Sequence, residues 1–319
     1  MPWRRNRGSV LGSAVVVVAW RAGWCNADMA GAWRELGIDA TLVSPARVRS
    51  IAGPGDVALN RLDVSARMDG VEPGLGVVAA LERAGVRVLN RPAAMLIAHD
   101  KLAAARRMES ARVAQPQCVD VPYGARTIDR LDPPLVLKPR FGSWGRDVLL
   151  CRTRDDVARA LAHSARLPWF ARGGAVAQSY VPHTADLRLV LAAGELVGSI
   201  ERRPAPREWR TNFSLGGSRR PVVPSGEAVE TARAAAAAVG TDLVGVDLVA
   251  APGGYLVIEV NGAVDFDRLY SLPGRDAYRD VADLLAFPVT HAASRRSAVR
   301  LSGPARWLPA TRWQTAAWR

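Results

Sequence analysis

Residues 243–261 constrain the fold of this chain more than any other segment, because two apolar runs flank a Pro-Gly-Gly turn sequence and so predict an antiparallel hairpin. Each run carries one carboxylate, Asp247 in the first and Glu259 in the second. A carboxylate is costly to bury unless it is paired or binds a metal. A three-residue loop at 252–254 would place Asp247 opposite Glu259, whereas a two- or four-residue loop would put them on opposite faces. We therefore predict the three-residue loop.

Asn261 adds a third polar side chain to this hairpin. It lies two residues beyond Glu259, so both side chains point to the same face of the strand. Carboxylate and amide oxygens grouped in this way suit magnesium, which prefers hard oxygen ligands beside substrate phosphates. The alternative is a salt-bridged hairpin with a polar end. We favour the metal, and Asp247, Glu259 and Asn261 are its predicted ligands.

A glycine-rich loop follows the predicted strand at residues 135–138. Lys138 ends that strand, and Gly142, Ser143 and Gly145 follow it. The lysine supplies a positive charge and the loop exposes backbone N–H groups, which together suit phosphate oxygens. It is not a Walker A loop, because the lysine precedes the glycines. Taken alone, this segment is better explained as a turn with a solvated lysine.

Charged residues recur between these two motifs. Asp186 and Arg188 share one face of a predicted strand. Glu201 and Arg203 share a face of the next strand, with Arg202 on the opposite face. Arginines beside a phosphoryl site neutralise charge on the transferred oxygens, and their fork geometry also captures carboxylates. Ion pairs on half-exposed strands are the alternative.

Short apolar runs alternate with helical stretches up to about residue 91, which is typical of βαβ units and a parallel sheet. The predicted strands here are residues 14–20, 41–43, 57–59 and 86–89, with a helix at 74–85. Beyond residue 92 the pattern predicts a helical region at 93–114, strands at 135–138, 148–151, 176–180, 187–193 and 196–202, and helices at 155–163 and 227–239. Thr153 and Asp156 have the spacing of a capping box, and Gly240 ends the last helix.

The formal net charge of +13 would suit a polyanionic partner, but arginine is spread over the whole chain, which favours a compositional bias. Basic strands interleaved with aromatic residues are missing, so no specific nucleic acid is predicted. Three cysteines without metal or disulfide spacing predict reduced thiols in a cytoplasmic protein. No apolar stretch approaches the roughly 20 residues that span a bilayer, so we expect no membrane anchor.

The two ends of the chain have their own composition. Arg4, Arg5 and Arg7 before an apolar run look like a signal peptide, but the strand-then-helix pattern that follows fits a buried parallel strand better. Beyond Asp283 there is no acidic residue. We expect residues 289–319 to form a basic, disordered tail.

One ordered series of motifs covers residues 90–270: Asp100-Lys101, Lys138-Pro with the 142–145 loop, Gln178-Ser-Tyr-Val181, Asp186-Leu-Arg188, Glu201-Arg-Arg203, Arg210-Thr-Asn212, Asp247 and Glu259-Val-Asn261. In this order the chain resembles the RimK-like ATP-grasp family of α-L-glutamate ligases. The resemblance implies an α/β fold with α+β character in its C-terminal lobes, in which a small parallel-sheet domain precedes the ATP-grasp fold. The expected domains are residues 1–92, a central lobe at 93–180, a C-terminal lobe at 181–288 and the tail at 289–319.

The resemblance also implies a role for each site residue. The implied nucleotide-binding residues are Lys101, Lys138, Gly142, Ser143, Gly145, Ser179, Tyr180, Asp186, Arg210, Thr211 and Asn212. Of these, the lysines would contact phosphates beneath the 142–145 loop, Ser179 and Tyr180 would border the adenine, and Asp186 would hold the ribose or a neighbouring polar group. Asp247, Glu259 and Asn261 would hold two magnesium ions, with manganese as the alternative. Arg203 and Arg188 would be the catalytic arginines, Arg203 steadying an acyl phosphate.

The implied reaction is ATP- and magnesium-dependent ligation of a carboxylate to an amine through an acyl phosphate, with glutamate as the added amino acid and an unspecified carboxylate acceptor. Another ATP-grasp ligase, acting on an amino-acid carrier or a peptide, and a catalytically silent nucleotide- or polyanion-binding protein are the alternatives; homo-oligomerisation is left open.

Two departures from the family matter. Ser179 stands where glutamate is frequent, and Gly262-Ala-Val-Asp265-Phe266 replaces a Pro-Gly turn after Asn261, which affects the expected acceptor pocket more than the ATP site.

Overall fold

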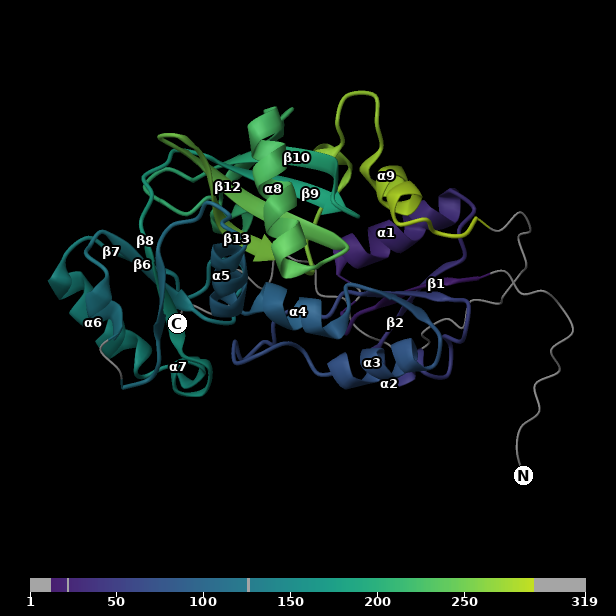
Figure 1. The fold of residues 1–319 in the computed structure, drawn as a ribbon, viewed down its shortest axis with the longest axis horizontal. Helices are drawn as coiled ribbons and strands as arrows, with labels where there is room; N and C mark the ends of the chain where they lie inside the picture. The colour runs from purple at the N-terminus through teal and green to yellow at the C-terminus, as the bar shows by residue number, and fades with distance from the viewer. Residues whose placement is uncertain (1–12, 22, 125–126, 290–319) are drawn as a thin grey trace, which may run out of the picture.

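The computed structural model describes residues 13–21, 23–124 and 127–289. Its strands form three sheets. Figure 1 shows the parallel sheet with α1, α2 and α3 at one end of the molecule, the central sheet with α6 and α7 at the other, and the C-terminal sheet with α8 above and between them. This mixture of a parallel sheet with later antiparallel sheets confirms the predicted fold class.

The first sheet is parallel, in the order β2-β1-β3-β4. Its strands are β1 (Val15–Val18), β2 (Ala40–Val43), β3 (Val57–Asn60) and β4 (Arg87–Leu89), and its helices are α1 (Trp24–Glu35), α2 (Pro45–Val48) and α3 (Leu75–Arg83). Every residue of β1 is buried, as expected for a β-branched strand covered on both faces. The prediction of a parallel N-terminal sheet is therefore confirmed.

Two helices, α4 (Pro92–His99) and α5 (Lys101–Ser110), form the predicted helical region, and Asp100 separates them. The Asp100 side chain accepts hydrogen bonds from the backbone N–H groups of Leu102 and Ala103 and so caps α5. Arg140 binds the same carboxylate through two hydrogen bonds of 2.7 and 2.6 Å. Apolar residues of α4 and α5 pack into the core beneath α8, so these helices are held against the C-terminal lobe.

The central sheet is antiparallel, in the order β5-β8-β6-β7. It comprises β5 (Cys118–Val121), β6 (Leu135–Pro139), β7 (Leu149–Cys151) and β8 (Ala175–Ser179), with α6 (Arg154–Ser164), α7 (Pro168–Gly173) and the 3₁₀ turn η1 (Thr127–Arg130). Thr153 and Asp156 form the predicted capping box at the start of α6. β6 leads directly into the glycine-rich loop.

The C-terminal sheet is also antiparallel, in the order β11-β10-β9-β12-β13. It comprises β9 (Asp186–Ala192), β10 (Glu195–Arg203), β11 (Ser218–Pro221), β12 (Leu243–Ala251) and β13 (Gly254–Asn261), with α8 (Gly226–Val239), α9 (Ala277–Leu284), η2 (Phe213–Leu215) and η3 (Arg268–Tyr270). Gly240 ends α8 in the left-handed conformation, as predicted. In Figure 1, α9 lies beside α1, next to the parallel sheet.

The predicted loop of the β12–β13 hairpin is wrong, although the pairing it was meant to secure is present. Ala251 pairs with Gly254, which leaves a two-residue loop. A β-bulge restores the register, because Leu248 pairs with Val257 and Asp247 pairs with Glu259. Ile258 is the extra residue, and one extra residue offsets the shift that a two-residue loop causes.

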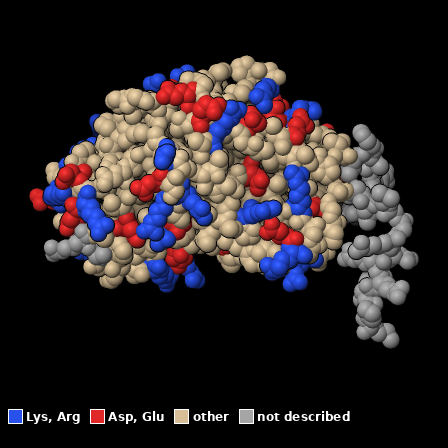
Figure 2. Space-filling view, viewed as in Figure 1, with Lys and Arg blue, Asp and Glu red and all other residues tan. Residues whose placement is uncertain are grey.

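The predicted basic tail lies outside the described residues, apart from Val289, and the arginines before β1 lie outside them as well. The domain boundaries stay predictions. Among the residues that the structure describes, no helix is long and apolar enough to cross a membrane. On the face drawn in Figure 2, basic side chains are interspersed with acidic ones over a largely uncharged surface.

Candidate functional site

A cavity opens between the central sheet and the C-terminal sheet. It encloses about 910 Å³ of empty space, including its open mouth, which is within the range of small-molecule sites. All of the predicted site residues except Arg203 line it, namely Lys101, Lys138, Gly142, Ser143, Gly145, Ser179, Tyr180, Asp186, Arg188, Arg210, Thr211, Asn212, Asp247, Glu259 and Asn261. The structure thus brings together residues that range from position 101 to position 261 of the chain.

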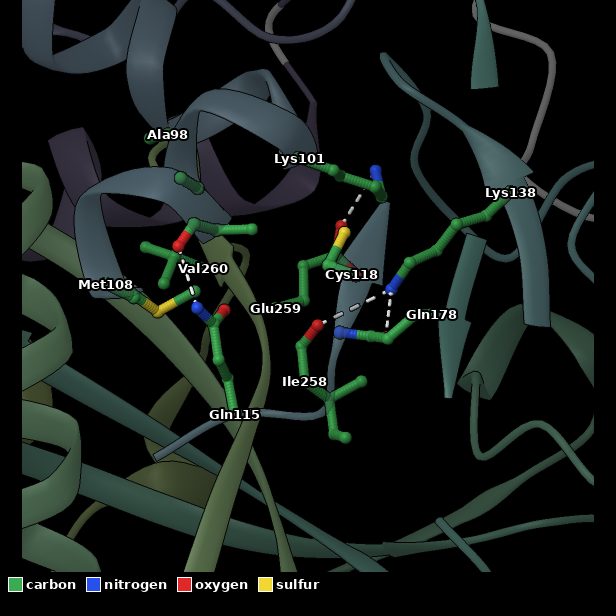
Figure 3. A pocket seen from close by; sticks show the side chains of 12 residues that line it. Ala98, Lys101, Met108, Gln115, Cys118, Lys138, Gln178, Ile258, Glu259 and Val260 are labelled. Atoms are coloured by element: carbon green, nitrogen blue, oxygen red, sulfur yellow. Dashed lines mark hydrogen bonds and ion pairs between the residues drawn. The ribbon is translucent and has the colours of Figure 1, made fainter. Parts of the chain in front are cut away.

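The only two lysines in the sequence lie in this cavity. Lys138, at the end of β6, donates to Gln178 Oε1 at 2.7 Å and lies 3.5 Å from the carbonyl oxygen of Ile258. Lys101, at the start of α5, forms an ion pair of 3.0 Å with Glu259. Figure 3 shows both ammonium groups directed at β13, Lys101 toward Glu259 and Lys138 toward the carbonyl of Ile258. Burial lowers the pKa of Lys138, although nearby Glu259 opposes the change.

The glycine-rich loop after β6 contacts the segment before β11. Arg210 donates to the carbonyl oxygen of Gly145 at 2.9 Å, and Ser214 donates to that of Trp144 at 3.2 Å. Gly145 has a φ of 71°, and an added Cβ there would lie 2.7 Å from Asn212 Oδ1. A hydrogen bond from Arg210 is the main cause that lowers the pKa of Glu208 to about 2, so this carboxylate stays ionised and orients the arginine. The loop therefore closes one side of the cavity.

Two arginines and two aspartates form a network on the cavity face of the C-terminal sheet. Arg188 binds Asp247 through two hydrogen bonds of 2.7 Å each, and Arg202 binds Asp186 through bonds of 2.7 and 2.6 Å. Arg202 also lies 2.9 Å from Asp247. Burial alone would raise the pKa of Asp247, but the two arginines outweigh it and hold the pKa well below its ordinary value. Asp247 and the two arginines are therefore ionised at neutral pH.

Strand pairing explains why these residues meet. Arg202 pairs with Asp186 across β10 and β9, and Arg188 pairs with Asp247 across β9 and β12. Directly paired residues in an antiparallel sheet point to the same face. Because Asp247 also pairs with Glu259, one face of four neighbouring strands carries the whole charged set.

Arg203, predicted to steady an acyl phosphate, does not line the cavity. It pairs with Glu201 at 2.7 Å, and its side chain is 56% exposed. Arg202 lines the cavity instead, with its side chain 7% exposed. Alternation placed the two arginines on opposite faces, but only the pairing of β9 with β10 shows which face meets the cavity.

Gln178, Ile258 and Trp209 also line the cavity and were not among the predicted site residues. Trp209 packs edge-on against Tyr180, with 5.9 Å between the ring centroids. The backbone N–H groups of Ser179 and Tyr180 donate to other backbone carbonyls of the protein. Any backbone contact from these two residues to a ligand is therefore limited to their carbonyl oxygens.

The predicted metal ligands fit a hard divalent cation by their chemistry. Asp247, Glu259 and Asn261 come from two paired strands and all line the cavity. The side-chain nitrogen of Asn261 is buried without a hydrogen-bond partner, so no contact within the described residues holds it. Groups of three or more acidic, histidine or cysteine side chains able to hold a metal are absent from the described part of the chain. The donor set therefore depends on the amide oxygen as well as the carboxylates.

A family model for the RimK-like ATP-grasp domain matches residues 109–285. Among curated relatives, a glutamate–LysW ligase ArgX from Sulfurisphaera tokodaii is 28% identical over 67% of this chain and 78% of its own length. A probable α-L-glutamate ligase from Pseudomonas paraeruginosa is 28% identical over 64% of this chain and 68% of its own length.

Solved structures share the fold. A RimK domain ATP-grasp protein from Sphaerobacter thermophilus has a TM-score of 0.63 at 24% identity, covering 85% of this chain and 99% of its own. A D-alanine–D-alanine ligase from Bacillus anthracis, complexed with ATP, has a TM-score of 0.63 at 16% identity, covering 88% of this chain and 96% of its own.

Proposed function

This chain belongs to the RimK-like ATP-grasp family and is an ADP-forming carboxylate–amine ligase, and we propose that it joins the amino group of glutamate to a carboxylate acceptor through an acyl phosphate. The single observation that supports the proposal best is the common cavity of Lys101, Lys138 and the Asp247–Glu259 pair. Cationic groups for phosphate and hard oxygen ligands for a divalent ion lie there within one cavity.

The proposed nucleotide contacts follow from the charges. Lys101 and Lys138 bind phosphate oxygens, because a lysine ammonium is a compact point charge with three donors. The loop carrying Gly142, Ser143 and Gly145 excludes water above the phosphates, and Arg210 holds this loop through the Gly145 carbonyl. Ile258 and Trp209 supply apolar surface for a base beside the Tyr180 carbonyl. ATP is the substrate that this combination fits.

Asp247, Glu259 and Asn261 are the residues that would hold magnesium, and we propose two ions. When bound, magnesium neutralises charge on phosphate oxygens as an anionic nucleophile approaches. Asp247 is already oriented by Arg188 and Arg202, so its carboxylate is fixed before any ion arrives. The paired arginines in turn place positive charge next to the position where a transferred phosphoryl group develops negative charge.

The proposed chemistry needs no covalent enzyme nucleophile. A carboxylate does not react with an amine at neutral pH, because its oxygen is a poor leaving group. Transfer of a phosphoryl group from ATP to that oxygen creates a good leaving group, and the amine then displaces phosphate to form the amide. Arg188 and Arg202 are the proposed catalytic arginines, Arg202 taking the part first given to Arg203.

The names of the two curated relatives share glutamate, and only the first also names a partner, LysW. Glutamate is therefore the proposed amine, while the acceptor is stated only as a carboxylate. The segment after Asn261, where the acceptor pocket is expected, is also where the chain departs from the family sequence.

The test is ADP release measured over a matrix of amino acids and carboxylate acceptors with ATP and magnesium. We expect release that requires one amine and one carboxylate together, with glutamate the preferred amine. Hydroxylamine in place of the amine should trap the activated acceptor as a hydroxamate. ADP release that proceeds with an amine alone, without any carboxylate acceptor, would contradict the proposed reaction.

A further inference from the structure

A second charged cluster lies where the first domain meets the C-terminal lobe, outside the cavity described above. Arg61 and Asp63 follow β3 at the carboxyl end of the parallel sheet, and Asp265 lies in the segment after β13. The guanidinium of Arg61 lies 3.7 Å from Asp265 Oδ1. Ligands of open α/β sheets bind outside the carboxyl ends of the strands, which is where this cluster stands.

Arg61 is buried but only partly satisfied. The residue is 2% exposed, and its Nε donates to Asn26 Oδ1 at 2.9 Å. Its Nη1 is buried without a hydrogen-bond partner, and Nη2 makes only long contacts to Cys25 Sγ and Asp265. A buried guanidinium nitrogen without an acceptor is costly, so this group points to an oxygen that a ligand would supply.

The two carboxylates are accessible and weakly paired. The side chains of Asp265 and Asp63 are 38% and 42% exposed. The 3.7 Å contact of Asp265 contrasts with the bonds of 2.6 to 2.7 Å in the Arg188 and Arg202 network. Asp63 Oδ1 already accepts a hydrogen bond of 2.6 Å from the backbone N–H of Val64, so its second oxygen and the Asp265 carboxylate supply the free acceptor capacity.

The charges of the cluster leave an excess of negative charge. Within the part of the chain that the structure describes, Arg61 is the one arginine that forms an ion pair with Asp265, whereas Arg188, close enough to influence it, already binds Asp247. Burial lowers the pKa of His99 beside Asp63, and burial raises the pKa of Cys25 to about 12, so neither side chain adds a charge at neutral pH. Glu72 adds a further carboxyl group, which Arg21 partly offsets. Desolvation raises the pKa of Asp265, and Arg61 opposes this change without cancelling it.

We propose that Asp265 and Asp63 bind the ammonium group of the amino-acid substrate, and that Arg61 Nη1 donates to an oxygen of the same head group. This inference rests on the proposed function, since it locates the amine substrate of that reaction. Asp265 lies four residues beyond Asn261 and close to Arg188, which lines the nucleotide cavity, so the amine is held beside the site of acyl transfer. Residues 262–266, which depart from the family sequence, would thus help to bind the amine substrate.

The test compares each amino acid with its deamino analogue. Dissociation constants of glutamate and glutarate, aspartate and succinate, and alanine and propionate are measured by calorimetry on the full chain with magnesium and a non-hydrolysable ATP analogue. We expect the wild type to prefer at least one amino acid over its analogue by about tenfold or more. Asp265→Asn and Asp63→Asn should each reduce that preference to within about threefold while the affinity for the ATP analogue is unchanged.

Asp267→Asn is the matched control, because Asp267 lies in the same segment but binds Arg219 at 2.8 Å and caps η3. It should keep the full preference. The inference is overturned if both Asp265→Asn and Asp63→Asn keep the preference, or if the wild type binds no amino acid better than its analogue. Failure of the proposed function would look different, as the absence of ADP release with every pair of amine and carboxylate.

Discussion

Single residues in the cavity differ in whether they serve the fold or the ligand, and Lys138 is the clearest case. Burial disfavours its charged form, so the folded protein gains little from this ammonium. Lys138→Ala should therefore leave the melting temperature within about 2 °C while ADP release falls by about 100-fold or more. Arg159→Ala, an exposed change on α6, is the control for both measurements. Loss of folding in Lys138→Ala would instead assign the lysine a structural role.

Asp247 serves both the fold and the ligand. It is a proposed magnesium ligand, and it also neutralises two buried arginines. Asp247→Asn should destabilise the fold by about 3 kcal/mol, since it leaves Arg188 and Arg202 short of negative charge. Glu201→Gln on the opposite face removes exposed ion pairs and should cost less than about 1 kcal/mol. Urea unfolding at pH 7 measures both changes in the free energy of unfolding. Equal losses in the two variants would contradict the burial argument.

The contribution of Asp247 should also depend on pH. Its pKa in the folded protein lies below the ordinary value of 3.8, so the stabilisation is complete above that value and is lost as the pH falls through the folded-state pKa. The difference in unfolding free energy between wild type and Asp247→Asn should be constant from pH 8 to pH 6 and should shrink only below about pH 4. A difference that already shrinks near pH 6 would show that another group titrates.

At the scale of elements, the glycine-rich loop depends on its contact with the segment before β11. Gly145→Ala places a Cβ 2.7 Å from Asn212 Oδ1, whereas Gly194→Ala at a similar φ of 81° meets nothing within 4 Å. Both should lose about 1 kcal/mol of stability, because alanine is strained at positive φ. Only Gly145→Ala should also raise the KM for ATP. If Gly194→Ala raised it equally, strain rather than closure of the loop would be the cause.

The bulge in β13 sets the geometry of one wall of the cavity. Deletion of Ile258 should keep the hairpin in register, because Val257 stays opposite Leu248 and Glu259 stays opposite Asp247. The variant should fold and keep its magnesium requirement, but bind ATP more weakly, since it lacks the Ile258 side chain and the carbonyl facing Lys138. Thermal melting and ATP titration measure the two effects. An unchanged ATP affinity would remove Ile258 from the nucleotide site.

At the scale of the whole molecule, the chain closes on itself through α9. The indole of Trp33 in α1 donates to the Tyr278 carbonyl at 2.9 Å, and its ring packs on Phe287 at 4.8 Å between centroids. A chain ending at Val289 should keep its ADP release, as the composition of the following residues predicts. A chain ending at Ser271 should fail to fold, because it exposes the core around Trp33. Circular dichroism measures folding, and ADP release measures turnover. Loss of turnover in the chain that ends at Val289 would show that residues 290–319 support the site.

The sequence alone determined features that depend on local periodicity or on short motifs. Alternation along β13 places Glu259 and Asn261 on one face, and the β-branched run of β1 requires a strand buried on both sides. The capping box of α6 and the glycine that ends α8 are fixed by residues within a few positions of each other. Such features form wherever the segment folds, so their prediction needs no knowledge of distant contacts.

Tertiary structure decided whatever depends on how distant segments pair. The pairing of β9 with β10 decides that Arg202, and not Arg203, faces the cavity. Asp247 pairs with Glu259 despite the two-residue loop only because Ile258 forms a β-bulge. Arg61 and Asp265 meet although they lie far apart in the sequence, and no local pattern relates them. A shift of one residue reverses every face of a strand, so register is a property of the assembled sheet rather than of either strand.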